Sequence, residues 1–146
     1  MESRFMARAI ELAREAAAEG EVPVGAVIVK NGVIIAEGKN RREKDRRAIA
    51  HAETEAIEAA NKATGDWRLD GATIYVTLEP CLMCAGAIAA ARISEIVFGA
   101  DDPERGFVLS RADICALTGA DISVFGGIKE DECKKLLDEF FLNRRK

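Results

Sequence analysis

The chain has 146 residues, and its 21 basic and 25 acidic residues give a net charge of −4, which argues against a general polyanion-binding surface. The length suits one domain with a substantial core, and the 49% of hydrophobic residues is ordinary for a globular protein. No apolar run reaches the roughly 18 residues of a membrane span, and the N-terminus lacks a signal-peptide pattern. Four cysteines, two of them in a CxxC pair, indicate a reducing compartment, so we expect a cytoplasmic protein without membrane association.

The predicted elements follow one another closely along the chain. An apolar stripe along 2–19 indicates a helix, and two β-rich runs around Asn31-Gly32 form a strong hairpin signal. After a polar loop at 38–47, we expect helices at 50–63, 81–92 and 129–142 and strands at 73–77, 95–99 and 121–125. The last helix is expected to turn five side chains inward: Cys133, Leu136, Leu137, Phe140 and Phe141.

This order of elements determines the expected fold. Helices between successive strands require a sheet with parallel members, covered by helices on both faces. The connection at 100–120, with about two helical turns, is long enough for a crossover, so the last two strands can also run parallel. We therefore expect a single domain over 1–146, an α/β fold built as a three-layer α/β/α sandwich on a five-stranded mixed sheet.

The residues that could bind a metal or take part in catalysis lie in two short motifs. Ala50-His51-Ala52-Glu53 holds the one histidine of the chain, and Pro80-Cys81-x-x-Cys84 follows at a strand-to-helix turn, with Pro80 expected in the first helical turn. One imidazole and two thiolates are three good zinc ligands, and three ligands leave the fourth position to water. Bound zinc lowers the pKa of that water to about 7. Glu53 is then a candidate for the carboxylate that carries the water's proton to a leaving group.

Two other interpretations of the cysteines stay open. A thioredoxin-like dithiol also has CxxC after a strand and at the start of a helix, but it leaves the histidine motif without a role. A closed structural zinc site would need a fourth ligand, for which Cys115 and Cys133 are candidates. Cys133 falls on the apolar stripe of the last helix, so we interpret it as a core residue.

The combination H-x-E and P-C-x-x-C resembles the signature of the cytidine/deoxycytidylate deaminase superfamily, the zinc-dependent nucleobase and nucleoside deaminases. The segments EVPVGAVIV, AHAE, TLEPCLMCAGAI, ARI and VFGA are most similar to those of the bacterial tRNA adenosine deaminases, in the same order over nearly the whole chain. The resemblance implies a cytidine deaminase-like fold and a single Zn²⁺ per chain. His51, Cys81 and Cys84 would be its ligands, and Glu53 the general acid/base.

The same resemblance implies a substrate site and a reaction. Asn40 would hydrogen-bond the flipped base, Val22 would line the pocket, Asp102 would lie near the nucleic-acid entrance, and Phe107 would lie at the pocket mouth. The reaction would be hydrolytic deamination of adenosine to inosine in a tRNA anticodon loop, and the assembly a homodimer.

Some segments depart from this family pattern on the substrate side. Arg47-Ala48-Ile49 replaces an expected Asp-Pro-Thr, Phe107-Val108-Leu109 follows Gly106 in place of small residues, and Gly119-Ala120 replaces an expected Asn-His pair. Deamination of a free nucleobase or nucleoside, such as guanine, cytosine or an adenine derivative, is therefore the alternative function. A non-catalytic zinc or dithiol protein is a more distant one. The basic segment 39–47 can be either a phosphate contact or a solvated loop.

Overall fold

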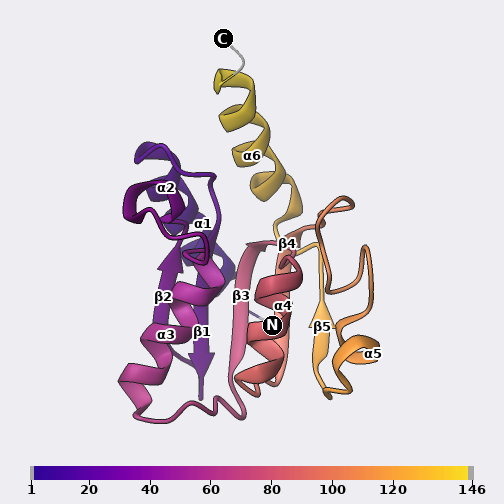
Figure 1. The fold of residues 1–146 in the computed structure, drawn as a ribbon. Helices are drawn as coiled ribbons and strands as arrows, with labels where there is room; N and C mark the ends of the chain where they lie inside the picture. The colour runs from indigo at the N-terminus through magenta and orange to yellow at the C-terminus, as the bar shows by residue number, and fades with distance from the viewer. Residues whose placement is uncertain (1, 145–146) are drawn as a thin grey trace.

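The computed structural model describes residues 2–144 (Figure 1). In chain order, its elements are α1 (Ser3–Ala18), β1 (Gly25–Lys30), β2 (Val33–Lys39), α2 (Arg42–Asp45), α3 (Ala52–Thr64), β3 (Thr73–Leu78), α4 (Leu82–Ala90), β4 (Glu95–Ala100), α5 (Ile114–Thr118), β5 (Ser123–Phe125) and α6 (Glu130–Arg144).

The five strands form one mixed sheet in the order β2-β1-β3-β4-β5. β1 pairs antiparallel with β2 and β3, whereas β4 pairs parallel with β3 and β5, as the long connection before β5 predicts. The β1–β2 hairpin turns at Asn31, whose φ of 53° is the left-handed conformation that a tight two-residue turn requires. Because β3 and β4 run parallel, the chain segments that follow them leave the same edge of the sheet.

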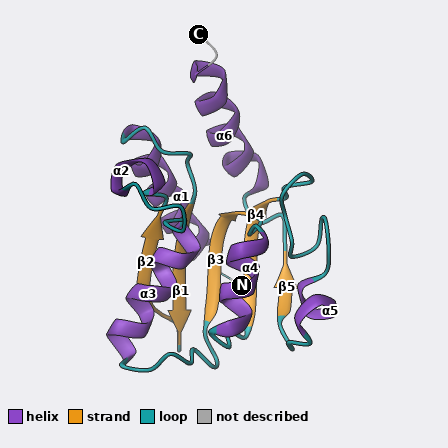
Figure 2. Ribbon diagram, in the orientation of Figure 1, coloured by secondary structure: helices purple, strands orange, loops and turns teal. Residues whose placement is uncertain are grey.

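Helices cover both faces of this sheet, which confirms the predicted three-layer sandwich (Figures 1 and 2). Alternate strand residues such as Ile28, Ile74 and Ile96 pack under α3 and α4 on one face. Their neighbours Val27, Tyr75 and Val97 pack on the other face in the cluster that contains the buried side of α1. The sheet thus holds α3 and α4 side by side, and their N-termini carry the two sequence motifs.

Several local expectations need correction. β2 continues to Lys39, because Lys39 is still paired with Gly25 of β1, and the predicted polar loop contains the short helix α2. Helix α4 starts at Leu82 with Cys81 as its N-cap, so Pro80 lies before the first turn rather than within it. The last strand is shorter than predicted and starts at Ser123.

Helix α6 differs most from its predicted packing. Cys133 is buried, as expected, but Phe141 is 46% exposed, so its predicted inward orientation is wrong. The physical reason is that α6 runs beyond the end of β4, where there is no sheet left to cover (Figure 1). Among residues 2–144, no helix has the length and apolar character required to cross a membrane.

Candidate active site and metal centre

Two helix N-termini meet at the edge of the sheet where β3 ends. His51 is the N-cap of α3, and its backbone N–H donates to Thr54 Oγ1 at 3.1 Å. Cys81 is the N-cap of α4, and Cys84 lies one turn further on the same side, with its side chain fully buried. The positive ends of both helix dipoles therefore point into one small volume, where they stabilise anionic ligands.

The three side chains are spaced as zinc ligands should be. The distance from His51 Nδ1 to Cys81 Sγ is 3.7 Å and to Cys84 Sγ is 3.6 Å, and all three ligand atoms lie within 4.8 Å of one another. Tetrahedral bonds of about 2.3 Å to sulfur and about 2.0 Å to nitrogen place those two ligand atoms roughly 3.6 Å apart. The donor set and its geometry therefore fit a zinc ion with one position left over.

The protonation states of the two thiols support this assignment. A hydrogen bond from Cys84 lowers the pKa of Cys81 to about 4. The same hydrogen bond, together with burial, raises the pKa of Cys84. One thiolate is thus present even without a metal, and metal coordination deprotonates thiols outright.

Glu53 lies in the first turn of α3, two residues after the histidine. Its side chain is only 4% exposed, and burial raises its pKa to about 7. A carboxyl group that changes protonation near neutral pH can both accept and release a proton. Its position on the wall shared with His51 and Cys81 is what a proton carrier beside the metal centre needs.

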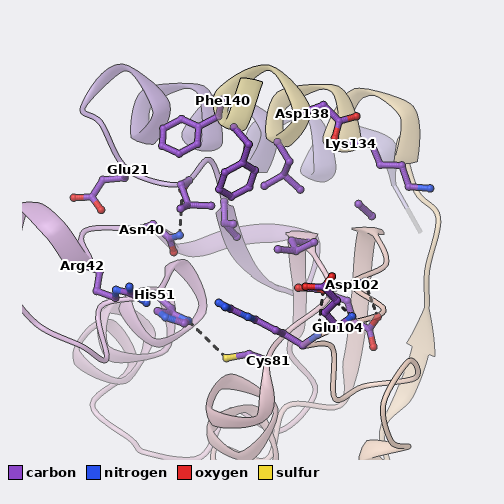
Figure 3. Close-up of a pocket in the computed structure, with 18 of the residues that line it drawn as sticks. Glu21, Asn40, Arg42, His51, Cys81, Asp102, Glu104, Lys134, Asp138 and Phe140 are labelled. Atoms are coloured by element: carbon purple, nitrogen blue, oxygen red, sulfur yellow. Dashed lines mark hydrogen bonds between the residues drawn. The ribbon is translucent and has the colours of Figure 1, made fainter. Parts of the chain in front are cut away.

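A cavity of about 690 Å³ opens above the metal centre (Figure 3). His51, Glu53 and Cys81 form part of its wall, and residues of α6 such as Phe140 form another part. Its volume is in the usual range for sites that bind small organic groups. The wall also includes three of the four residues expected to contact substrate: Val22, Asn40 and Asp102.

Asn40 makes more contacts than the sequence indicates. Its Nδ2 donates to the carbonyl of Val22 at 3.1 Å, the dashed line at Asn40 in Figure 3, and its Oδ1 accepts from the N–H of Ala52 at 2.9 Å. Because Ala52 lies between His51 and Glu53, Asn40 fixes the first turn of α3 while it also lines the cavity.

The fourth expected residue, Phe107, lies beside the cavity rather than on its wall. It lines a shallow depression next to the cavity, together with Cys81, Leu82 and Met83, and packs partly against the core. The other two cysteines also stay outside the metal centre: Cys115 donates to the carbonyl of Ile122 at 3.2 Å, and Cys133 is in the core. Within residues 2–144, the metal-ligand group therefore consists of His51, Cys81 and Cys84.

The basic segment 39–47 is largely neutralised by its own surroundings. Four of its six basic side chains have carboxylate oxygens within 4 Å: Lys39, Arg41, Lys44 and Arg47. Among residues 2–144, Arg42 and Arg46 have no such partner, and of these two only Arg42 lines the cavity, where it lies beside His51 (Figure 3). Arg42 is therefore the cation of this segment best placed to meet a substrate phosphate.

Two buried glutamates at the cavity could not be identified from the sequence pattern. Glu21, which is 2% exposed, accepts hydrogen bonds from the backbone N–H groups of Glu43 at 3.1 Å and Lys44 at 2.7 Å. Glu79, also 2% exposed, accepts hydrogen bonds from backbone N–H groups of the segment that follows β4. The one sequence signal was the place of Glu79 next to Pro80-Cys81, and nothing in the pattern around Glu21 marks it as buried.

Comparisons with known proteins identify the family. A family model for the cytidine and deoxycytidylate deaminase zinc-binding region matches residues 1–100, which include both motifs of the metal centre. The tRNA-specific adenosine deaminase of Bacillus subtilis (strain 168) is 47% identical over 144 residues, which cover 97% of this chain and 89% of that protein. A protein of the same name from Agrobacterium fabrum is 41% identical over 98% of this chain and 95% of its own length.

Solved structures agree with the sequence relatives. One from a study of A-to-I editing by tRNA:A34 deaminases at the wobble position of transfer RNA has a TM-score of 0.90 and 41% identity, covering 93% of this chain and 100% of that one. A guanine deaminase from Nitrosomonas europaea has a TM-score of 0.85 and 25% identity, covering 96% and 84% of the two chains. The predicted fold and family are confirmed: the chain belongs to the cytidine and deoxycytidylate deaminases and is a zinc-dependent hydrolytic deaminase.

Proposed function

We propose that this chain converts adenosine to inosine in the anticodon loop of a tRNA. The observation that carries the proposal is the group of His51, Cys81 and Cys84 beside the buried Glu53, at the wall of a cavity of about 690 Å³. The choice of tRNA rests on the relatives, which include tRNA-specific adenosine deaminases up to 47% identical to this chain.

The proposed roles follow from the chemistry of the side chains. His51 Nδ1 and the sulfurs of Cys81 and Cys84 would hold the zinc, which supplies hydroxide at neutral pH by lowering the pKa of water. The attacking oxygen forms a bond to C6 of the adenine ring, and the bond from C6 to the exocyclic nitrogen breaks. Glu53 carries the proton from the attacking water to that nitrogen, so that ammonia leaves and inosine remains.

The base must leave its stack to reach this site, because Glu53 and Cys84 are buried. The cavity is large enough to enclose one base. The second N–H of Asn40 Nδ2, the one not used for the Val22 carbonyl, is available to hydrogen-bond it. Val22 would supply apolar contact on the same side.

The phosphates that flank a flipped base require cations near the cavity. Arg42 meets this requirement, since it lines the cavity and forms no ion pair with residues 2–144. Its position supports a polynucleotide substrate in spite of the acidic net charge, because only the local charge at the entrance meets the RNA.

A free base remains the second candidate substrate. The similarity to the Nitrosomonas europaea guanine deaminase favours it, as do the acidic side chains of Asp101, Asp102 and Glu104 on the cavity wall. These carboxylates would repel phosphates but accept hydrogen bonds from the amino groups of a small base.

We further propose that the chain forms a homodimer. The outward face of α4 supports this assembly: Leu82 is 58% exposed and Met83 36%, and nothing lies within 4 Å of the place where a Cβ of Gly86 would be. A small, apolar helix face permits close approach of a second copy. Sedimentation equilibrium of the zinc-loaded chain should give twice the mass of one chain, and Leu82→Glu should give a monomer. A wild-type monomer would contradict this assembly.

The substrate is tested with the zinc-loaded chain. An anticodon stem-loop with adenosine at the wobble position, the full tRNA, and a panel of free bases and nucleosides are assayed for inosine and for ammonia. We expect inosine in the stem-loop and the tRNA and little ammonia from the free compounds. Rapid ammonia release from a free base, with no inosine in either RNA, would replace the first candidate with the second.

A further inference from the structure

The buried carboxylate of Glu79 lies in the turn between β3 and α4 and accepts five hydrogen bonds. Its Oε1 accepts from the N–H of Asp102 at 3.0 Å and from the hydroxyl of Ser110. Its Oε2 accepts from the N–H groups of Val108 at 3.2 Å, Leu109 at 2.8 Å and Ser110 at 2.8 Å. All these donors belong to one segment, 102–110, which we call the entrance loop.

The entrance loop wraps closely around this carboxylate. Phe107 N–H donates to the carbonyl of Pro80 at 3.0 Å, and Gly106 forms a β-bridge with Cys81. A Cβ added to Gly106 would lie 2.3 Å from Glu79 Cδ, so this approach permits only glycine. The loop is therefore shaped around the Glu79 side chain, and Val108 anchors it in the core.

The hydrogen bonds suit a carboxylate at Glu79. Five donors point at its two oxygens, two at Oε1 and three at Oε2. An ionised carboxylate only accepts hydrogen bonds, which suits four backbone N–H groups. Both carboxylate oxygens thus accept hydrogen bonds from the entrance loop, and neither is free to take part in the reaction at the metal centre.

We propose that Glu79 is a positioning residue for the RNA substrate, acting through the entrance loop. The loop carries Asp102, Glu104 and Arg105 to the cavity wall, so the Glu79 carboxylate determines the shape of the opening. This inference rests on the proposed function, because nucleotides on both sides of a flipped base must fit that opening. A free base would need only the cavity itself.

The entrance loop touches the metal centre through the β-bridge of Gly106 with Cys81, but each ligand also has backbone hydrogen bonds within its own helix. Cys81 is fixed by α4, since its carbonyl accepts from Ala85 N–H at 2.8 Å, and His51 is fixed by α3. Loosening the entrance loop should therefore weaken contacts that substrate and transition state share. Such a loss raises KM and leaves kcat nearly unchanged.

The test compares three variants of the full, zinc-loaded chain. Glu79→Gln has the same shape but places an NH₂ group against hydrogen-bond donors, and Glu79→Asp keeps the charge with a shorter reach. Glu58→Gln makes the same chemical change at an exposed site of α3 and is the matched control. Bound zinc, KM and kcat on the anticodon stem-loop, and amide hydrogen exchange are measured for each.

For Glu79→Gln we expect full zinc occupancy, a KM raised about tenfold and a kcat within about twofold of wild type, the loss expected for a charged hydrogen bond. Amide exchange should accelerate at Asp102, Val108, Leu109 and Ser110. The KM of Glu79→Asp should fall between those of Glu79→Gln and wild type. If Glu79→Gln fails to fold, the KM of Glu79→Asp is the test of the inference. Glu58→Gln should match wild type.

Two results would overturn the inference: an unchanged KM in both Glu79 variants, or a kcat that falls with zinc content while KM stays constant. The second result would mean that Glu79 supports only the metal centre. A wild-type chain that forms no inosine in RNA would instead overturn the proposed function, and this inference with it. The wild-type assay thus separates the two failures.

Discussion

Replacing Arg42 with alanine should weaken the binding of an anticodon stem-loop and make that binding less sensitive to salt. The reason lies in the ion pairs of segment 39–47, where four of the six basic side chains are already neutralised by carboxylates. Arg42 has no carboxylate partner among residues 2–144 and lies on the cavity wall.

The expected magnitude follows from counterion release. Each phosphate neutralised in a single-stranded segment contributes about −0.7 to the slope of log affinity against log salt. Between about 50 and 200 mM salt, one such contact changes the affinity by about 2.6-fold. The wild-type affinity should therefore fall about 2.6-fold more than that of Arg42→Ala over this range.

The measurement is fluorescence anisotropy with a labelled stem-loop, in a Glu53→Gln background so that no product forms. Arg46→Ala is the matched control, because Arg46 is an exposed cation of the same segment that does not line the cavity. The slope of log affinity against log salt in Arg46→Ala should equal that of wild type. An unchanged slope in Arg42→Ala, or the same reduction in both variants, would refute the assignment of Arg42 to a phosphate.

Three more predictions follow from the site and the fold. Glu53→Gln should keep its zinc by elemental analysis but lose at least about a hundredfold in the rate of inosine formation, since a positioned acid–base group contributes about 10²–10⁴; a near wild-type rate would contradict the role of Glu53. Cys84→Ser should lose both zinc and activity, because a serine hydroxyl is a poor substitute for thiolate, and tight zinc binding in this variant would remove Cys84 from the ligand set. Hydrogen bonds from Arg8 at 2.7 and 2.9 Å lower the pKa of Glu37 below its ordinary 4.5. Their stabilisation is therefore present above about pH 4.5 and is lost as the pH falls through the folded pKa. Wild type should exceed Glu37→Gln in unfolding free energy, measured with urea, near pH 7 but not near pH 2.

The sheet and the metal group could be predicted because their signals are local. Alternating helical and β-rich segments determine the layers, and Cys81 and Cys84 lie one turn apart at a helix start that a nearby proline marks. His51 joins them because α3 and α4 cover the same face of the sheet, which the order of elements already implies.

The cavity wall could not be predicted in the same way, because its contacts join distant segments. Glu79 meets donors 23 to 31 residues further along the chain, and no periodicity in either segment indicates that pairing. The error at Phe141 has a related cause: the apolar stripe of α6 is real, but its second half extends past the sheet.

The placement of α6 separates the two walls of the cavity along the chain. All three metal-binding residues lie before residue 85, whereas Phe140 and its neighbours on the opposite wall are made last. The metal ligands and the far wall of the cavity therefore belong to separate parts of the chain. For the same reason, changes confined to the final helix can alter which molecules enter without disturbing the metal chemistry.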